Sequence, residues 1–252
     1  SPIVFSPKEP EALYFSSQLI WRSLDEGANW QAISPDLTRP AGGPQPSSEG
    51  GPAEFQKVTG CGVVYTVAPS PLDAGLLWAG TDDGFIWATR DGGRNWNNVT
   101  PQALGPWSKV SLIDASHFDA GTTYAAIDRH RLDDPQPHIL RTHDYGRTWQ
   151  EVDAGLSSGG YVHVVREDPG RQGLLYAGSE VGVSVSLDDG DHWQSLQLNL
   201  PTSPIHDLAV HGDDLIVATH GRSFWVLDDV TALRQLSPEA VSYTHLRAHE
   251  TG

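Results

Sequence analysis

Ser23-Leu-Asp25-Glu-Gly27-Ala-Asn-Trp30 is the first of four stretches that share the pattern Ser/Thr-x-Asp-x-Gly-x-x-Trp. The other three are Thr89-Arg-Asp91-Gly-Gly93-Arg-Asn-Trp96, Thr142-His-Asp144-Tyr-Gly146-Arg-Thr-Trp149 and Ser186-Leu-Asp188-Asp-Gly190-Asp-His-Trp193. A fixed spacing of Asp, Gly and Trp that recurs four times identifies a repeat protein, in which each repeat contributes one supersecondary unit. We refer to these four stretches as the octapeptides.

Each octapeptide has the chemistry of a hairpin turn between two strands. The Asp carboxylate can accept hydrogen bonds from backbone N–H groups just after it, and the Ser or Thr hydroxyl can add another. The Gly suits a position of positive φ, and the Trp opens the next strand with a large ring to bury. We therefore expect a structural role, and not one as general acids or ligands, for the repeated residues Asp25, Gly27, Trp30, Asp91, Gly93, Trp96, Asp144, Gly146, Trp149, Asp188, Gly190 and Trp193.

Short segments rich in aromatic and β-branched residues surround the octapeptides, as expected for strands. Aligned second strands are expected at residues 13–17, 76–81, 174–179 and 215–220. Apolar runs that precede second strands are expected as innermost strands, at residues 63–69, 110–114, 161–165 and 205–210. A third strand comes before each octapeptide and a fourth after it. The sequence therefore predicts an all-β chain of four-stranded antiparallel units, four to five in number.

The octapeptides resemble the Asp-box, or BNR repeat, of sialidases, sortilin-type propellers, xyloglucan hydrolases and photosystem assembly factors. The stretch Thr219-His-Gly-Arg-Ser-Phe-Trp-Val-Leu-Asp-Asp229 further resembles bacterial sortilin N-terminal-like proteins that carry the label glycosyl hydrolase, BNR repeat. This resemblance covers residues 1–236 and implies a partial β-propeller, with the octapeptides on the blade rims between the third and fourth strands. It also implies that ligands bind on the opposite face.

Composition excludes several classes of function. The formal net charge is −16 and only three lysines occur, so the surface repels nucleic acid and anionic membranes. No run approaches the roughly 18 apolar residues of a membrane span, so we expect no membrane insertion. The single cysteine, Cys61, cannot form an internal disulfide and is expected to be a small buried side chain. No motif indicates a cofactor or a metal.

One loop after a second strand is the strongest candidate for ligand binding. It reads Asp128-Arg-His-Arg-Leu-Asp-Asp134 and places cationic groups beside carboxylates. The guanidinium groups of the arginines there could bind carboxylates or sugar hydroxyls. The alternative is a structural loop whose ion pairs lie on the surface or connect neighbouring blades. The candidate ligand-binding residues, taken from this loop and from the loop that follows residue 219, are Arg129, His130, Arg131, Asp133, His220 and Arg222.

These observations favour a binding or scaffold module with a carbohydrate or protein ligand. The resemblance implies a secreted or cell-envelope bacterial protein, and the alternative is a sialidase-like or xyloglucanase-like glycoside hydrolase. The doublet Asp82-Asp83 invites that alternative, but adjacent residues on a strand point to opposite faces and the doublet fits turn chemistry better. Residues 237–252 contain a stretch that resembles a translated sequencing adapter, and we expect a disordered, non-native tail there.

Overall fold

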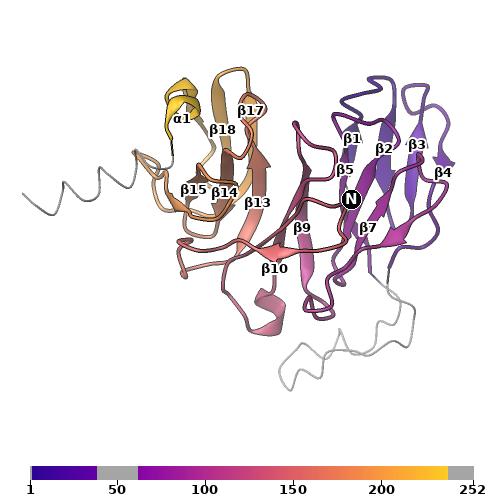
Figure 1. The fold of residues 1–252 in the computed structure, drawn as a ribbon, viewed down its shortest axis with the longest axis horizontal. Coiled ribbons are helices and arrows are strands. Elements are labelled where there is room, and N and C mark those ends of the chain that lie inside the picture. The colour runs from indigo at the N-terminus through magenta and orange to yellow at the C-terminus, as the bar shows by residue number, and fades with distance from the viewer. Residues whose placement is uncertain (1, 39–61, 238–252) are drawn as a thin grey trace, which may run out of the picture.

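The computed structural model describes residues 2–38 and 62–237, which form five antiparallel sheets arranged side by side in an arc (Figure 1). The first sheet contains β1 (Ile3–Phe5), β2 (Leu13–Ser16), β3 (Ile20–Ser23) and β4 (Gln31–Ala32). The second contains β5 (Val64–Pro69), β6 (Leu77–Thr81), β7 (Ile86–Thr89) and β8 (Asn97–Asn98). Cys61, most of the loop after β4 and the tail from residue 238 lie outside the described residues.

The remaining three sheets repeat this order. The third contains β9 (Lys109–Ala115), β10 (Thr123–Asp128), β11 (His138–Thr142) and β12 (Gln150–Glu151), with the short 3₁₀ helix η1 (His130–Leu132) after β10. The fourth contains β13 (Val162–Glu167), β14 (Leu175–Ser179), β15 (Val183–Ser186) and β16 (Gln194–Ser195). The fifth contains β17 (Ile205–His211), β18 (Asp214–Thr219) and β19 (Phe224–Leu227), and the helix α1 (Thr231–Gln235) follows it.

The predicted all-β architecture of four-stranded propeller blades is thus confirmed for four sheets, and a fifth has three strands. The first strand of each sheet lies against the first strand of the next, from β5 through β9 and β13 to β17. Four buried apolar clusters fill the spaces between consecutive sheets. The chain therefore has one apolar core layer between each pair of consecutive blades. None of its described helices is long and apolar enough to cross a membrane.

The four octapeptides adopt one hydrogen-bonded turn between the third and fourth strands. In the second sheet the Thr89 hydroxyl donates to the Asp91 carboxylate at 2.9 Å, and the Gly93 N–H donates to that hydroxyl at 3.0 Å. The Asp91 carboxylate also accepts the Asn95 N–H at 2.9 Å and the Asn95 amide at 2.7 Å. These bonds hold the pKa of Asp91 at about 2, and the glycine has a φ of +93°. Equivalent bonds occur in the other three octapeptides.

The octapeptide tryptophans connect each sheet to the one before it. The indole N–H of Trp96 donates to the Ile33 carbonyl at 2.9 Å, three residues beyond Trp30 of the preceding octapeptide. Trp149 donates to Val99 at 2.7 Å and Trp193 donates to Val152 at 2.8 Å, again three residues beyond the preceding tryptophan. The repeat therefore fixes the contact between consecutive blades as well as the turn within each blade.

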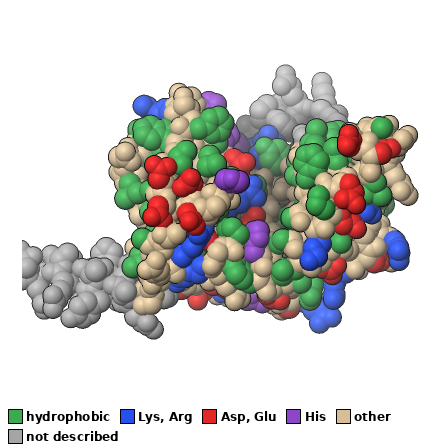
Figure 2. Space-filling view, turned by 90° about the horizontal axis from the view of Figure 1, so that it is seen from above, with side chains coloured by type: hydrophobic (Ala, Val, Ile, Leu, Met, Phe, Trp, Pro, Cys, Tyr) green, Lys and Arg blue, Asp and Glu red, His purple; other side chains and the backbone are tan. Residues whose placement is uncertain are grey.

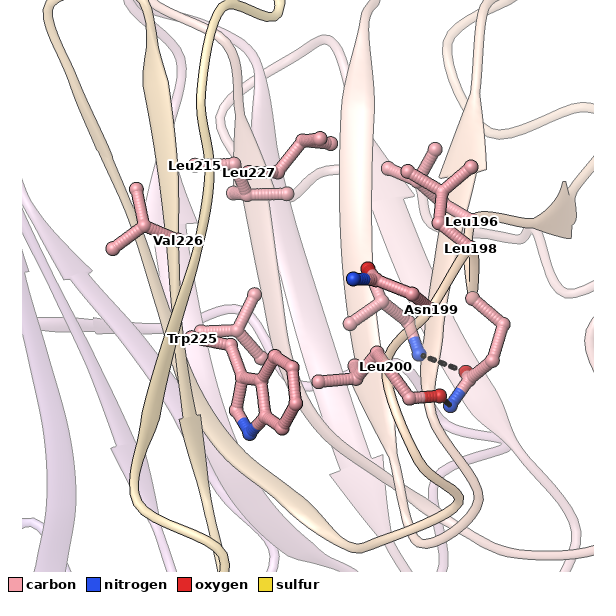
Figure 3. A pocket seen from close by; sticks show the side chains of 11 residues that line it. Leu196, Leu198, Asn199, Leu200, Leu215, Trp225, Val226 and Leu227 are labelled. Atoms are coloured by element: carbon pink, nitrogen blue, oxygen red, sulfur yellow. Dashed lines mark hydrogen bonds between the residues drawn. The ribbon is translucent and has the colours of Figure 1, made fainter.

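The fifth sheet lacks a fourth strand, and an apolar groove lies beside it (Figure 3). The groove runs between the segment after β16 and the strands β18 and β19, with Leu196, Leu200, Leu215 and Trp225 in its walls. Leu196 stands three residues beyond Trp193, which is the position whose carbonyl receives an indole in the earlier sheets. The groove thus follows from the sequence after β19, which has lost the Gly and Trp of the octapeptide.

The innermost strands of sheets two to five share a β-bulge near their first residue. Between β5 and β6 the register passes from Val64 opposite Thr81 to Thr66 opposite Gly80, so one residue is extra. The same shift occurs in the pairs β9–β10, β13–β14 and β17–β18. A bulge turns its extra side chain out of the normal alternation of the strand. The residues placed in this way are Tyr65, Ser111, His163 and His206.

Candidate ligand-binding row

Five planar side chains form a continuous row across the third, fourth and fifth sheets. The His130 ring stacks on Tyr161 with centroids 4.7 Å apart, and Tyr161 meets His163 edge to face at 4.8 Å. His163 stacks on His206 at 4.8 Å, and His206 contacts His220 at 5.1 Å. We call these five residues the ring row. Figure 2 shows histidine side chains gathered along the hollow between the two halves of the arc.

The repeat explains why these residues meet. His163 and His206 are the bulge residues of neighbouring innermost strands, and Tyr161 immediately precedes one of those strands. His220 is the first residue after β18, and its N–H donates to Pro204 at 2.8 Å. His130 begins η1 after β10. The ring row is thus built from loops and strand ends on the face opposite the octapeptides, because alternate turns of an antiparallel sheet lie at opposite ends.

Carboxylates hold the rings of the row in place. Glu180, the first residue after β14, accepts a hydrogen bond from His163 Nε2 at 2.6 Å. Burial and the charge and hydrogen bond of Glu180 raise the pKa of Tyr161 to about 12, so its hydroxyl stays protonated. Asp128, which is buried, contacts His130 Nδ1 at 2.5 Å and also accepts the His130 N–H. These contacts orient His130, Tyr161 and His163.

His206, which lies between His163 and His220 in the row, has a lowered pKa. Partial burial is the largest cause, and the neighbouring His163, His220 and Lys109 lower the pKa further against the opposing effect of Glu180. The lowered pKa favours the neutral form of the ring, which has one donor and one acceptor nitrogen.

The polar surface continues from the ring row towards the second sheet. Lys109 lies 3.7 Å from Asp128 and places its ammonium 4.0 Å from the centre of the Tyr65 ring. Asp82 follows β6 and accepts the Val63 N–H at 2.7 Å. Burial raises the pKa of Asp82, and the charge of Asp83 adds to this rise while the charge of Arg131 opposes it. The face therefore carries rings, cations and carboxylates over four consecutive sheets.

A partly exposed ion-pair network connects the innermost strands beside this face. Arg166 on β13 bonds the Asp114 carboxylate on β9 at 3.1 Å and the Asp207 carboxylate on β17 at 3.0 Å. Its Nε also donates to the Leu208 carbonyl at 2.9 Å. One guanidinium thus ties three consecutive sheets together, which keeps the ring row in a fixed geometry.

The structure places only some of the six predicted ligand contacts in or near the ring row. His130 and His220 belong to the ring row, and the Arg131 charge acts on both Asp82 and Tyr161. Arg129 instead turns back to Asp134 at 3.3 Å, as the ion-pair alternative for this loop describes. Asp133 is an exposed left-handed residue at the end of η1, and Arg222 is exposed beyond β18. Their role in binding stays a prediction.

Sequence reasoning missed most of the residues that complete this face, namely Tyr65, Lys109, Tyr161, His163, Glu180 and His206. A signal was present, because the second residue of three innermost strands is a planar ring: Tyr65, His163 and His206. The Asp82-Asp83 doublet stabilises the turn after β6, as the sequence predicted. The Thr81 hydroxyl donates to the buried Asp83 carboxylate at 2.5 Å, while Asp82 faces the loop before β5.

The stacked imidazoles do not converge on a common point as metal ligands would. In residues 2–38 and 62–237, one group brings three possible donor atoms within 4.8 Å of one another, and it lies elsewhere, on the outer strands of the third sheet. The row therefore has the geometry of a binding surface for a flat or extended ligand.

Comparisons with known proteins support the fold. No family model and no curated protein matches the sequence. Among solved structures, the GH74 xyloglucanase from Xanthomonas campestris is 17% identical with a TM-score of 0.65, over 95% of this chain and 38% of that one. An ancestral GH74 enzyme is 19% identical with a TM-score of 0.64, over 86% of this chain and 27% of that one.

A third similar structure is the β-propeller domain of Cps50 (Swd1) from Myceliophteria thermophila. It is 10% identical with a TM-score of 0.62, over 94% of this chain and 68% of that one. Enzymes and a non-GH74 propeller therefore match this chain about equally well at identities that carry fold information alone. The chain has the β-propeller fold, and it spans well under half the length of the GH74 structures that it resembles.

Proposed function

We propose that this chain is a ligand-binding propeller module and that the ring row binds a carbohydrate chain. The observation that carries the proposal is the unbroken contact of five planar side chains, from His130 to His220, across three blades. We further infer that the octapeptides are Asp-boxes, which the four equivalent turns support. The secreted or cell-envelope location expected for sortilin-like proteins is part of the same proposal.

The chemistry of the row suits a neutral, polyhydroxylated ligand. Sugar rings present apolar C–H faces that lie flat on planar side chains, and their hydroxyls donate to carboxylates placed beside those rings. Glu180 provides such an acceptor beside the Tyr161–His163 pair, whereas the buried Asp128 orients His130. The net charge of −16 disfavours a polyanionic ligand. A row over several blades favours an extended chain over a single sugar.

The binding test uses neutral oligosaccharides, with xyloglucan fragments first because the Xanthomonas campestris neighbour is named as a xyloglucanase. We expect retardation in affinity electrophoresis for at least one glycan. The double variant His163→Ala/His206→Ala should weaken it at least tenfold, since the centre of the row is lost. His192→Ala is the matched control, because His192 is exposed in the fourth octapeptide, on the opposite face. Equal retardation of the double variant and the control would overturn the proposal. Binding of a protein, lost in the double variant, would instead show that the ligand of the ring row is a protein and not a carbohydrate.

A glycoside hydrolase is the second candidate, and Asp82 is the observation that favours it. Its raised pKa would let it stay protonated longer than an ordinary carboxyl group, as a general acid requires. A retaining or inverting mechanism also needs a second carboxyl group about 5–10 Å away across the glycosidic bond. Release of reducing sugar from a bound glycan, abolished by Asp82→Asn with binding retained, would establish this activity.

A further inference from the structure

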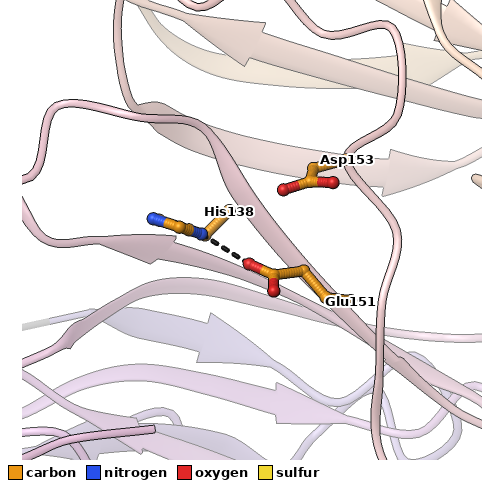
Figure 4. A group of neighbouring side chains, drawn as sticks. All are labelled: His138, Glu151 and Asp153. Atoms are coloured by element: carbon orange, nitrogen blue, oxygen red, sulfur yellow. Dashed lines mark hydrogen bonds and ion pairs between the residues drawn. The ribbon is translucent and has the colours of Figure 1, made fainter. Parts of the chain in front are cut away.

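A histidine and two carboxylates converge on the outer side of the third sheet, away from the ring row (Figure 4). His138 is the first residue of β11, Glu151 is the last residue of β12, and Asp153 lies two residues further along the chain. One donor atom from each of the three lies within 4.8 Å of the other two. The strand pairing of β11 with β12 is what brings these donors together.

The other nitrogen of His138 is already fixed by a carboxylate. His138 Nε2 lies 3.1 Å from Asp134 Oδ2, and Asp134 is itself held by Arg129 at 3.3 Å and by the Gln136 N–H at 3.2 Å. Metal-binding histidines almost always donate their second ring N–H to such a carboxylate, which sets the tautomer and the ring orientation. Asp134 therefore orients the His138 ring so that Nδ1 faces Glu151.

The contact on the other side of the ring is a hydrogen bond that a metal ion would replace. Nδ1 of His138 and Oε1 of Glu151 are 2.5 Å apart. Metal binding to such a pair displaces the shared proton and lets the two donor atoms move apart around the ion. Asp153 brings a second carboxylate within 4.8 Å of both atoms, which a single proton does not need and a metal ion uses.

An apolar pocket borders His138 and Glu151. Its walls include Leu104, Leu140 and Trp149, and His138 and Glu151 form part of its rim. Apolar walls lower the local dielectric and strengthen the attraction between a cation and its ligands. The side chain of His138 is only 16% exposed, so this ligand is held rather than free to rotate in water.

We propose that His138, Glu151 and Asp153 form a binding site for a divalent transition metal ion, with Asp134 as the positioning residue for His138. One imidazole and two carboxylates suit Zn²⁺, which binds three protein ligands and leaves the fourth position to water or to a ligand group. Ca²⁺ needs six to eight oxygens and Mg²⁺ retains most of its water, so neither fits three protein donors as well.

The test is calorimetric titration of the tag-free chain with Zn²⁺ at neutral pH. We expect one site that Mg²⁺ in large excess does not displace, weakened at least tenfold by His138→Ala, by Glu151→Gln and by Asp153→Asn. Asp134→Asn should weaken Zn²⁺ binding by about 10- to 100-fold without removing a ligand. Circular dichroism checks that each variant remains folded, and X-ray absorption should report only nitrogen and oxygen ligands at about 2.0–2.2 Å.

The double variant His163→Ala/His206→Ala is the matched control, because it removes two histidines from the ring row and should leave Zn²⁺ affinity unchanged. Two results would overturn the assignment. One is the absence of Zn²⁺ binding in the folded wild-type chain. The other is binding that survives His138→Ala and disappears in the ring-row variant, which would place the ion among the stacked imidazoles.

Discussion

Replacing Trp193 with Phe tests whether the octapeptide tryptophans join the blades. The Trp193 side chain is 5% exposed, and its indole N–H donates to the Val152 carbonyl of the preceding sheet at 2.8 Å. The substitution removes this hydrogen bond and leaves a buried carbonyl without its partner, which costs about 1–3 kcal/mol. The smaller ring adds a cavity, which brings the expected loss of unfolding free energy to about 2–4 kcal/mol.

Trp30 provides the matched control for this prediction. It occupies the same position in the first octapeptide, but its sheet is the first of the chain, its side chain is 38% exposed, and its ring packs edge to face on Phe15. Trp30→Phe should therefore cost about 0.5 kcal/mol or less, as is usual for exposed sites. Urea unfolding followed by far-UV circular dichroism compares the two variants. Equal losses of stability, or no loss for Trp193→Phe, would refute the reasoning.

Two further predictions concern packing and acid stability. Gly178→Ala should destabilise the fold by about 1–3 kcal/mol, because an added Cβ would lie 2.6 Å from Ile205 of the next sheet. Gly105→Ala is the control and should change stability little, because an added Cβ there would have no atom within 4 Å. Thermal unfolding compares the two variants. The octapeptide carboxylates should stabilise the fold above about pH 4 and lose this effect as the pH falls towards 2, because the folded-state pKa of Asp91 is about 2 against about 3.9 unfolded. A melting temperature that stays constant from pH 5 to pH 2 would contradict this, and Asp91→Asn should reduce the slope.

The octapeptide predicted the blade architecture well because it carries a complete local structure. The Ser or Thr hydroxyl, the Asp carboxylate and the positive-φ Gly all bond within five residues, so the sequence pattern alone specifies the turn. The loss of Gly and Trp after β19 likewise coincides with the missing fourth strand. The sequence reasoning implied a strand before the loop at Asp128 without giving its bounds, which are those of β10 (Thr123–Asp128). It did not anticipate the helix α1, which Arg234 anchors through Asp168 at 2.9 Å.

The ring row was harder to predict because it depends on contacts between blades. Whether His163 meets His206 is decided by the bulge that turns each side chain out of its strand and by the distance between neighbouring sheets. Neither can be read from strand alternation, which assigns such residues to one face or the other. Only two of the six predicted contact residues, His130 and His220, lie in the row, since the prediction rested on charge within one loop.

The repeat also explains how the side chains on one face can differ from blade to blade. The last residue of β6, β14 and β18 is Thr81, Ser179 or Thr219, and its hydroxyl helps to close the turn that follows. Ser179 and Thr219 donate to a carbonyl three or four residues ahead, whereas Thr81 donates to Asp83 and accepts the Phe85 N–H. The residue that follows makes a backbone bond to the loop before the innermost strand, and its side chain is free to differ: Asp82, Glu180 or His220. The backbone bond holds each of these side chains at the same place in its blade, so the chemistry of the face differs from blade to blade. Under the proposed function, these positions and the bulge residues beside them would set the ligand, while the octapeptides on the other face hold the blades together.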